Sequence, residues 1–154
     1  MELKTCYKVR FTDCDPFKHL NNSAYIDYML NAREDHLAQF HDIKMTDLYA
    51  KGLGWMVSHH EIVYLKPAIY DETVCIQSAL IKAQDDALQV EMIMFNEGQT
   101  QIKAILHTKF THVNLATGKR DNHPDWFMQL ALGFEDKALQ SYASVKERLA
   151  VLLK

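Results

Sequence analysis

Residues 23–40, SAYIDYMLNAREDHLAQF, carry the pattern on which the fold prediction rests. Apolar side chains recur in this stretch at steps of three and four residues, which places them on one face of an α-helix. This stripe consists of Ala24, Tyr25, Tyr28, Met29, Ala32, His36, Leu37 and Phe40. Asn21, Asn22 and Ser23 are residue types that favour the position just before a helix. The sequence therefore predicts a central helix of about five turns with one buried face.

The segments on both sides of this helix follow a period of two, which is typical of half-buried strands. A short helical piece is expected at residues 45–50, and the alternation then continues for most of the chain. The predicted strands cover residues 5–11, 55–66, 72–82, 87–96 and 100–114. Asp85-Asp86 and Asn96-Glu97-Gly98 are short turns of the type that joins antiparallel neighbours.

Two more helices are expected after residue 120. Pro124 suits the first turn of one helix and Gly133 suits the position after its end, while a second helix is predicted at residues 135–153. The order of elements favours an α+β fold, because a parallel α/β fold needs helices between its strands. We expect a single domain over residues 1–154. Its core, residues 4–120, is an antiparallel five-stranded sheet wrapped around the central helix, and residues 121–154 form a C-terminal helical extension.

The composition excludes several classes of protein. The 154 residues include 17 basic and 20 acidic side chains, for a net charge of −3, so we expect no nucleic-acid partner. No apolar stretch approaches the length of a membrane span. The three cysteines, Cys6, Cys14 and Cys75, are an odd number whose spacing predicts neither a disulfide framework nor a zinc site. A cytoplasmic location is therefore expected.

Polar residues gather in the loop before the central helix, at residues 13–22, DCDPFKHLNN. This loop contains two carboxylates, one imidazole and two amides. The first backbone N–H groups of a helix lack intrahelical partners, so they can polarise a carbonyl oxygen that docks there. A carboxylate a few residues upstream can attack that carbonyl or deprotonate a water molecule.

These residues resemble hotdog-fold thioesterases of the 4-hydroxybenzoyl-CoA thioesterase type. The resemblance spans about residues 4–120. It rests on the Asp-x-Asp of the loop, on His-Leu-Asn-Asn at 19–22, on Tyr25, Tyr28 and Ala32-Arg33, and on YLKPA at 64–68 and VNLATGK at 113–119. It implies a hotdog fold and hydrolysis of an acyl-CoA thioester to the free acid and CoA. It also implies a homodimer or homotetramer in which the active site lies between subunits.

The resemblance also implies roles for individual residues. By position, Asp15 is the catalytic carboxylate, and the thioester carbonyl is held by a backbone N–H near Asn22 or Ser23. His19 corresponds to the catalytic histidine of acyl-ACP thioesterases, and an ordinary loop histidine is the alternative reading. Asn22 is also a candidate N-cap. Lys18 stands where many members that act on CoA thioesters have glycine.

Two further residues are candidates for substrate binding, each with a structural alternative. Tyr25 either lines the acyl pocket or belongs to the core, and Lys66 either meets a CoA phosphate or is a solvated lysine at a strand end. Asp13 and Asp15 together suggest Mg²⁺, but phosphoryl-transfer sites of that kind need a parallel α/β scaffold that the strand pattern does not predict. We expect no metal and no cofactor, because water and a carboxylate suffice for thioester cleavage.

Three alternatives to an acyl-CoA thioesterase stay open at this point. The His-x-Asn-Asn segment also fits an acyl-ACP thioesterase. A non-catalytic hotdog module that binds acyl thioesters or serves assembly is a second alternative, and a hotdog dehydratase or hydratase is a third. The sequence does not determine the length of the acyl chain or whether it is aromatic.

Overall fold

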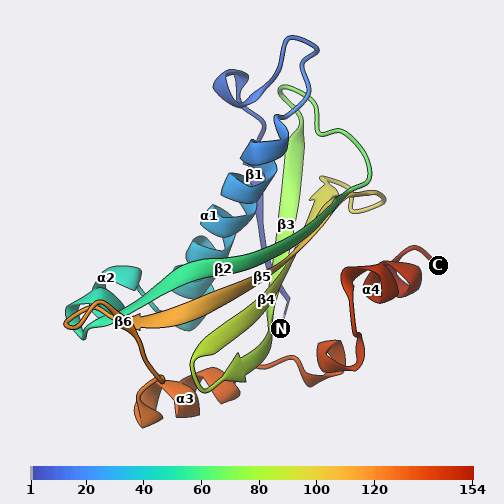
Figure 1. Ribbon diagram of the computed structural model, residues 1–154. Helices are drawn as coiled ribbons and strands as arrows, with labels where there is room; N and C mark the ends of the chain where they lie inside the picture. Colours follow the sequence, from blue (N-terminus) through green and yellow to red (C-terminus); the bar gives the residue numbers. More distant parts are fainter. Residues whose placement is uncertain (1) are drawn as a thin grey trace. The chain divides into compact units, whose positions relative to one another are not determined.

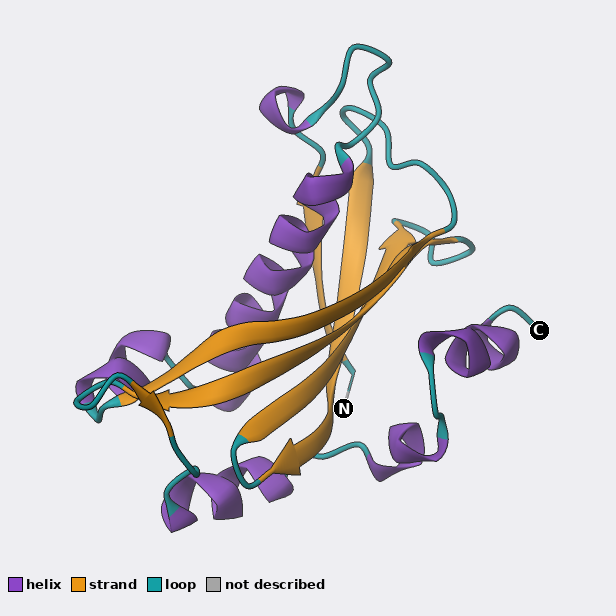
Figure 2. Cartoon of the chain, viewed as in Figure 1, coloured by secondary structure: helices purple, strands orange, loops and turns teal. Residues whose placement is uncertain are grey.

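The computed structural model describes residues 2–154 and contains the predicted central helix and a sheet of strands (Figures 1 and 2). In chain order the elements are β1 (Leu3–Lys8), the 3-10 turn η1 (Phe11–Asp13), α1 (Asn22–His41), α2 (Met45–Ala50), β2 (Leu53–Tyr64), β3 (Thr73–Gln84), β4 (Ala87–Asn96), β5 (Ile102–Asn114), β6 (Lys119–Arg120), α3 (Asp125–Leu132), the 3-10 turn η2 (Lys137–Ser141) and α4 (Val145–Leu152). The predicted α+β class is confirmed.

The strands form a sheet in the order β1-β3-β4-β5-β2, and β6 pairs with β5. The predicted count of five strands was therefore one short, because β6 has only two residues and shows no alternation. β1 is antiparallel to β3. The bonds between β2 and β5 show the same sense, since Ser58 bonds to the carbonyl of Lys109 while Leu65 bonds to that of Lys103. The sheet is antiparallel, as predicted.

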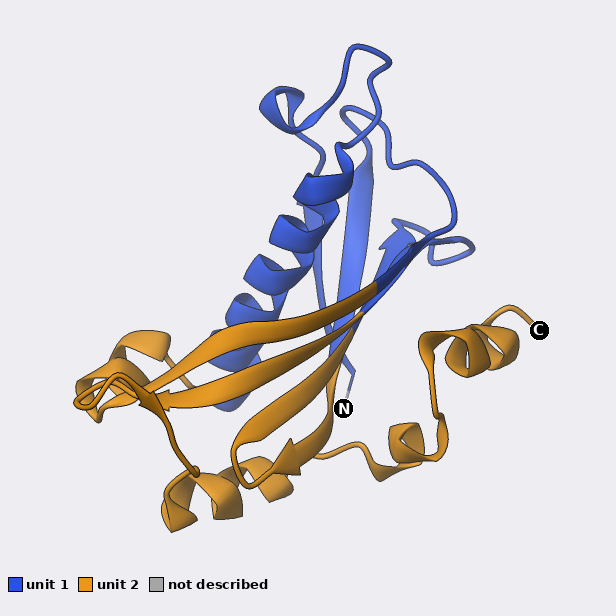
Figure 3. Ribbon diagram, viewed as in Figure 1, with its two compact units in different colours: residues 1–42, 62–78, 92–106 blue, residues 43–61, 79–91, 107–154 orange. Residues whose placement is uncertain are grey.

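The contacts within the chain divide it into two compact units (Figure 3). Unit 1 comprises residues 1–42, 62–78 and 92–106, and unit 2 comprises residues 43–61, 79–91 and 107–154. Strands β2 to β5 each contribute residues to both units. The expectation of one domain over residues 1–154 stays a prediction.

In unit 1, α1 runs beside β1 (Figure 1). Met29 and Ala32 of the predicted apolar stripe are fully buried, so the periodicity assigned the correct face. His36 is fully buried as well, and its ring bonds to Thr5 of β1 and Ser78 of β3. Arg33, which the stripe did not include, is also buried and donates to the same Ser78 hydroxyl at 2.9 Å.

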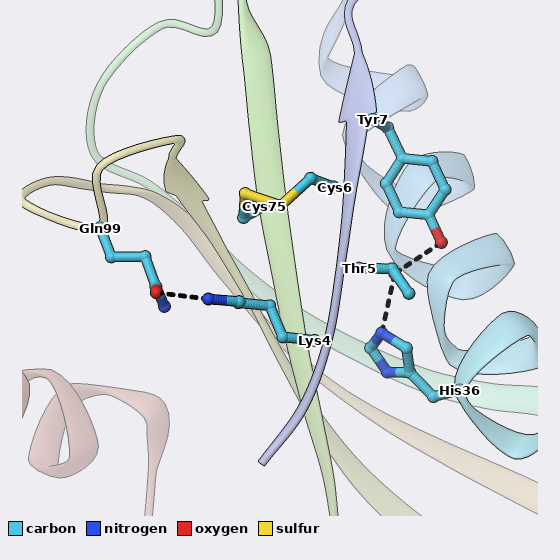
Figure 4. The surroundings of a disulfide bond; sticks show 7 residues. All are labelled: Lys4, Thr5, Cys6, Tyr7, His36, Cys75 and Gln99. Atoms are coloured by element: carbon cyan, nitrogen blue, oxygen red, sulfur yellow. Dashed lines mark hydrogen bonds between the residues drawn. A yellow bond between two sulfur atoms is a disulfide. The ribbon is translucent and has the colours of Figure 1, made fainter. Parts of the chain in front are cut away.

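The cysteines depart from the prediction, because Cys6 and Cys75 form a disulfide (Figure 4). These two residues lie directly opposite each other in the pairing of β1 with β3, although 69 positions separate them in the sequence. Cys14 is the remaining free cysteine. The odd number of cysteines argued against a disulfide, but the strand register brings one pair together and leaves the third apart.

The C-terminal region contains shorter elements than the predicted helix at residues 135–153. The chain there forms η2 and α4 with an extended break between them. Ser144 starts the new helix, because its hydroxyl accepts a hydrogen bond from the Glu147 N–H. The Glu147 carboxylate in turn accepts from the Ala143 N–H at 2.6 Å. This arrangement is a form of the capping box, a local start signal that overrides a continuous apolar stripe.

No helix within residues 2–154 is long and apolar enough to cross a membrane.

Candidate active site

The loop between β1 and α1 is organised around the carboxylate of Asp15. Its Oδ1 atom accepts hydrogen bonds from the backbone N–H groups of Phe17 and His19, both at 2.9 Å. The Asp15 backbone N–H donates to the His19 carbonyl at 2.8 Å, so the loop closes on itself. Oδ1 is therefore held by the loop, while no residue in the described chain donates a bond to Oδ2.

A tight turn at Lys18 makes this closure possible. Lys18 has a φ of 67°, in the left-handed region that favours glycine. Its backbone N–H donates to the Asp15 carbonyl at 3.0 Å. Lys18 therefore adopts a backbone conformation that glycine adopts most easily.

The β2–β3 connection, residues 65–72, packs against this loop. The Leu20 N–H donates to the Ala68 carbonyl at 2.8 Å, and the Tyr70 N–H donates to the Lys18 carbonyl at the same distance. His19 and Ile69 form an isolated antiparallel bridge. The loop that carries Asp15 is therefore fastened to a segment that lies about fifty residues further along the chain.

The first turn of α1 has no side-chain cap. Asn21 is the N-cap by position, but its side chain makes no capping hydrogen bond. The prediction of Asn22 as an N-cap was wrong, because Asn22 is the first residue of the helix. Within residues 2–154 the backbone N–H groups of Asn22 and Ser23 have no hydrogen-bond acceptor. These two donors, at the positive end of the helix dipole, are available to a ligand.

A cleft of about 470 Å³ brings most of the predicted residues together. Its lining comprises Asp15, His19, Leu20, Asn21, Asn22, Tyr25, Tyr64, Leu65, Lys66 and Pro67. All of these residues belong to unit 1. Of the six residues predicted for the site, five line this cleft, and the exception is Ser23, which is exposed and outside the lining.

Two tyrosines form the aromatic side of the cleft. Tyr25 is buried, and its ring meets that of Tyr64 edge to face with centroids 5.1 Å apart. The Tyr25 hydroxyl accepts from the Ala68 N–H at 2.8 Å, and the Tyr64 hydroxyl donates to the Asn22 carbonyl at 2.9 Å. Burial raises the pKa of both phenols, so both stay protonated at neutral pH. Sequence reasoning assigned no role to Tyr64, although it begins the YLKPA segment.

The two remaining candidates both line the cleft and are both exposed. His19 orients Asp15 through its backbone N–H and carbonyl, and its imidazole is exposed at the cleft. The exposed Lys66 lines the cleft and has no ion-pair partner in the described chain. Within residues 2–154, no three His, Cys, Asp or Glu side chains gather as a metal site requires.

The chain is similar to known proteins both in sequence and in fold. The sequence model of the thioesterase-like superfamily matches residues 9–130. The long-chain acyl-CoA thioesterase FadM of Escherichia coli strain K12 is 25% identical over 117 residues, which cover 76% of this chain and 87% of FadM.

Solved structures establish the fold. The hypothetical protein TT1821 from Thermus thermophilus superposes with a TM-score of 0.79 at 21% identity, covering 87% of this chain and 100% of that one. The 1,4-dihydroxy-2-naphthoyl-CoA thioesterase Slr0204 from Synechocystis gives a TM-score of 0.74 at 16% identity, over 85% and 95% of the two chains. The predicted hotdog fold is confirmed.

Proposed function

Because the chain belongs to the thioesterase-like superfamily, we propose that it hydrolyses acyl-CoA thioesters to the free acid and CoA, with Asp15 as the catalytic carboxylate. The observation that carries this proposal is the cleft itself, in which Asp15 lies together with the uncapped start of α1. A fixed carboxylate beside unpaired helical N–H donors is the arrangement that cleavage of a polarised carbonyl requires.

The reaction follows from these two features. The thioester carbonyl oxygen accepts hydrogen bonds from the backbone N–H of Asn22 or Ser23, which stabilise the negative charge that develops on it. Oδ2 of Asp15 attacks the carbonyl carbon, the C–S bond breaks, and the CoA thiolate leaves; water then hydrolyses the anhydride. Alternatively, Oδ2 takes a proton from a water molecule that attacks, and the proton passes to the departing thiolate. Both routes use one water and yield the acid and the thiol.

The other lining residues hold the substrate. The Tyr25 hydroxyl accepts from Ala68, which leaves its own proton to donate toward a ligand in the cleft. His19 lines the same cleft as Asp15, where its imidazole can orient the attacking water. Lys66 offers a positive charge to a CoA phosphate. Ser23 contributes its backbone N–H, and its side chain has no part in this scheme.

The partner and the setting of the reaction belong to the same proposal. β1 and β2 are the two edges of the sheet, and an unpaired edge favours strand pairing with another copy, so we expect a homodimer or homotetramer. Light scattering on the purified protein measures its mass directly. A cytoplasmic location stays a prediction, as does the choice of CoA over acyl carrier protein.

The test is thiol release from a panel of short-chain, long-chain and aromatic acyl-CoAs, with wild type and Asp15→Asn side by side. We expect turnover of at least one acyl-CoA, and a loss of kcat of about 10²- to 10⁴-fold in the variant. Asp71→Asn is the matched control. Asp71 is exposed, has a φ of 70° that asparagine tolerates, and lies outside the cleft lining, so this variant retains activity.

Each other result has a definite meaning. Full activity in Asp15→Asn contradicts the catalytic assignment and keeps the enzyme class. Release from acyl-ACP alone identifies acyl carrier protein as the carrier, which is the alternative that the His-Leu-Asn-Asn segment left open. Binding of an acyl thioester without any release identifies a non-catalytic binding module, and turnover of a 3-hydroxyacyl substrate without thiol release identifies a dehydratase.

A further inference from the structure

One buried charge in unit 1 bonds to a residue of the cleft lining and has no place in the reaction scheme. Lys103, on β5, is flanked by the buried residues Ile102, Ala104 and Ile105, and its side chain is only 7% exposed. An ammonium group in such surroundings costs free energy unless partners satisfy it. An apolar residue would continue this strand without that cost, so the lysine needs a separate explanation.

The Lys103 ammonium and the Lys103 backbone carbonyl both bond to the β2–β3 connection. Its ammonium donates to the Pro67 carbonyl at 3.1 Å and pairs with Glu72 at 3.2 Å. Its backbone carbonyl accepts from the N–H groups of Leu65 at 2.8 Å and Lys66 at 3.1 Å. Lys103 therefore holds both ends of this eight-residue connection.

Glu72 extends this attachment into the middle of the connection. The oxygen that pairs with Lys103, Oε1, also accepts from the Ile69 N–H at 2.7 Å. Between these anchors, Ala68 donates to the Tyr25 hydroxyl and accepts from the Leu20 N–H. Leu65, Lys66 and Pro67 line the cleft directly.

We propose that Lys103 is a positioning residue for substrate binding: its ammonium, paired with Glu72, holds the β2–β3 connection in the shape that forms one side of the cleft. This inference rests on the proposed function for its kinetic consequence. Lys103 does not touch the cleft, whereas Asp15 is held by the separate bonds from Phe17 and His19. Loss of the Lys103 ammonium therefore loosens the connection at Pro67 and Glu72, and it breaks none of the bonds that join the connection to the Asp15 loop or fix Oδ1 within that loop.

Lys103→Met, which keeps the length and apolar stem of the side chain, tests this directly. With the acyl-CoA that wild type hydrolyses fastest, we expect KM to rise about tenfold while kcat stays within about twofold. A residue that only sustained stability would reduce the amount of active enzyme, which lowers the apparent kcat and leaves KM unchanged. Lys103→Arg keeps the positive charge, so we expect its KM to lie close to the wild-type value.

Lys8→Met is the matched control. Lys8 forms an ion pair with Asp71, the neighbour of Glu72, but both side chains are about 60% exposed. Exposed pairs of this kind contribute little. We expect wild-type KM and kcat in this variant. An equal rise of KM in Lys8→Met and Lys103→Met would show that the loss of any positive charge has this effect, and it would overturn the proposal.

Amide hydrogen exchange provides a readout that needs no activity. In Lys103→Met we expect faster exchange at Ala68 and Ile69, with the β1–β3 ladder unchanged. Unchanged exchange in the β2–β3 connection, or a kcat loss at constant KM, would overturn the proposal. If wild type cleaves no thioester, the proposed function fails, and the exchange result alone decides whether Lys103 holds this connection.

Discussion

At the scale of single residues, unit 1 contains a chain of polar contacts beneath α1 whose proton positions follow from one another. Thr5 donates to Tyr7, and Tyr7 donates to Asp35 at 2.6 Å, so the Thr5 oxygen must accept from Nε2–H of His36. The other ring nitrogen of His36, Nδ1, lies 2.6 Å from the Ser78 hydroxyl. Because burial lowers the pKa of His36 to about 4, the imidazole is neutral at neutral pH, and its Nδ1 then accepts from the Ser78 hydroxyl (Figure 4 shows the Thr5 end).

This neutral state predicts a specific loss of stability in acid. Burial, with the nearby charge of Arg33, lowers the pKa of His36 from 6.5 to about 4. Between pH 6.5 and pH 4 the unfolded chain binds a proton at His36 that the folded chain does not bind. The contribution of His36 to the free energy of unfolding is therefore fully present above pH 6.5 and is lost as the pH falls toward 4. Over this pH window we expect the free energy of unfolding of wild type to fall by up to roughly 3 kcal/mol more than that of His36→Gln. Urea unfolding at several pH values measures the free energy of unfolding of both proteins. The same dependence on pH in wild type and His36→Gln would contradict the prediction.

At the scale of elements, α4 depends on a local start signal and on two acidic anchors in unit 2. Glu61 accepts from the Val145 N–H at 2.9 Å. Glu91, buried on β4, accepts two bonds from the Arg148 guanidinium and one from His107. Burial alone would raise the pKa of Glu91, but the bonds from His107 and Arg148 hold it below its ordinary value. α4 is therefore a docked element with a charged anchor.

The capping box of α4 gives a prediction at this scale. Ser144→Ala removes the acceptor for the Glu147 N–H, so we expect the free energy of unfolding to fall by about 1 kcal/mol. Lys146→Ala, on the exposed side of the same helix, is the control and should leave stability nearly unchanged. Urea unfolding of both variants measures the difference. Equal losses in the two variants would show that the cap does not stabilise α4.

At the scale of the whole molecule, the Cys6–Cys75 disulfide closes a loop across much of the chain. Cross-links over long loops stabilise mainly by restricting the unfolded chain. We expect the Cys6→Ser, Cys75→Ser double variant to lose about 2–4 kcal/mol of unfolding free energy, while Cys14→Ser loses little.

A thiol count on the denatured protein tests the cross-link itself. One thiol per chain is expected before reduction, from Cys14, and three afterwards. Three thiols without added reductant would contradict the disulfide. Disulfides are rare in the cytosol, so the same count on freshly extracted protein also tests the predicted cytoplasmic location.

Elements whose signals are local follow from the sequence alone. The three- and four-residue period over residues 23–40 predicted α1 to within one residue at each end, and α2 and β4 were predicted at their observed bounds. The Asp-x-Asp loop and His-Leu-Asn-Asn segment identified three residues that line the cleft, Asp15, His19 and Asn22, because this stretch forms its own hydrogen-bonded loop. Where a local signal competed with a periodic one, as at Ser144, the cap decided where the helix began.

Contacts between residues far apart in the chain become visible in the folded structure and not before. Strand register brought Cys6 opposite Cys75, and the pairing of β5 with the β2–β3 connection gave Lys103 its contacts with Pro67 and Glu72. The bond from the Tyr64 hydroxyl to the Asn22 carbonyl, in the first turn of α1, is another contact between distant residues. No period or spacing encodes these contacts, because register and packing are settled by the burial of many side chains together.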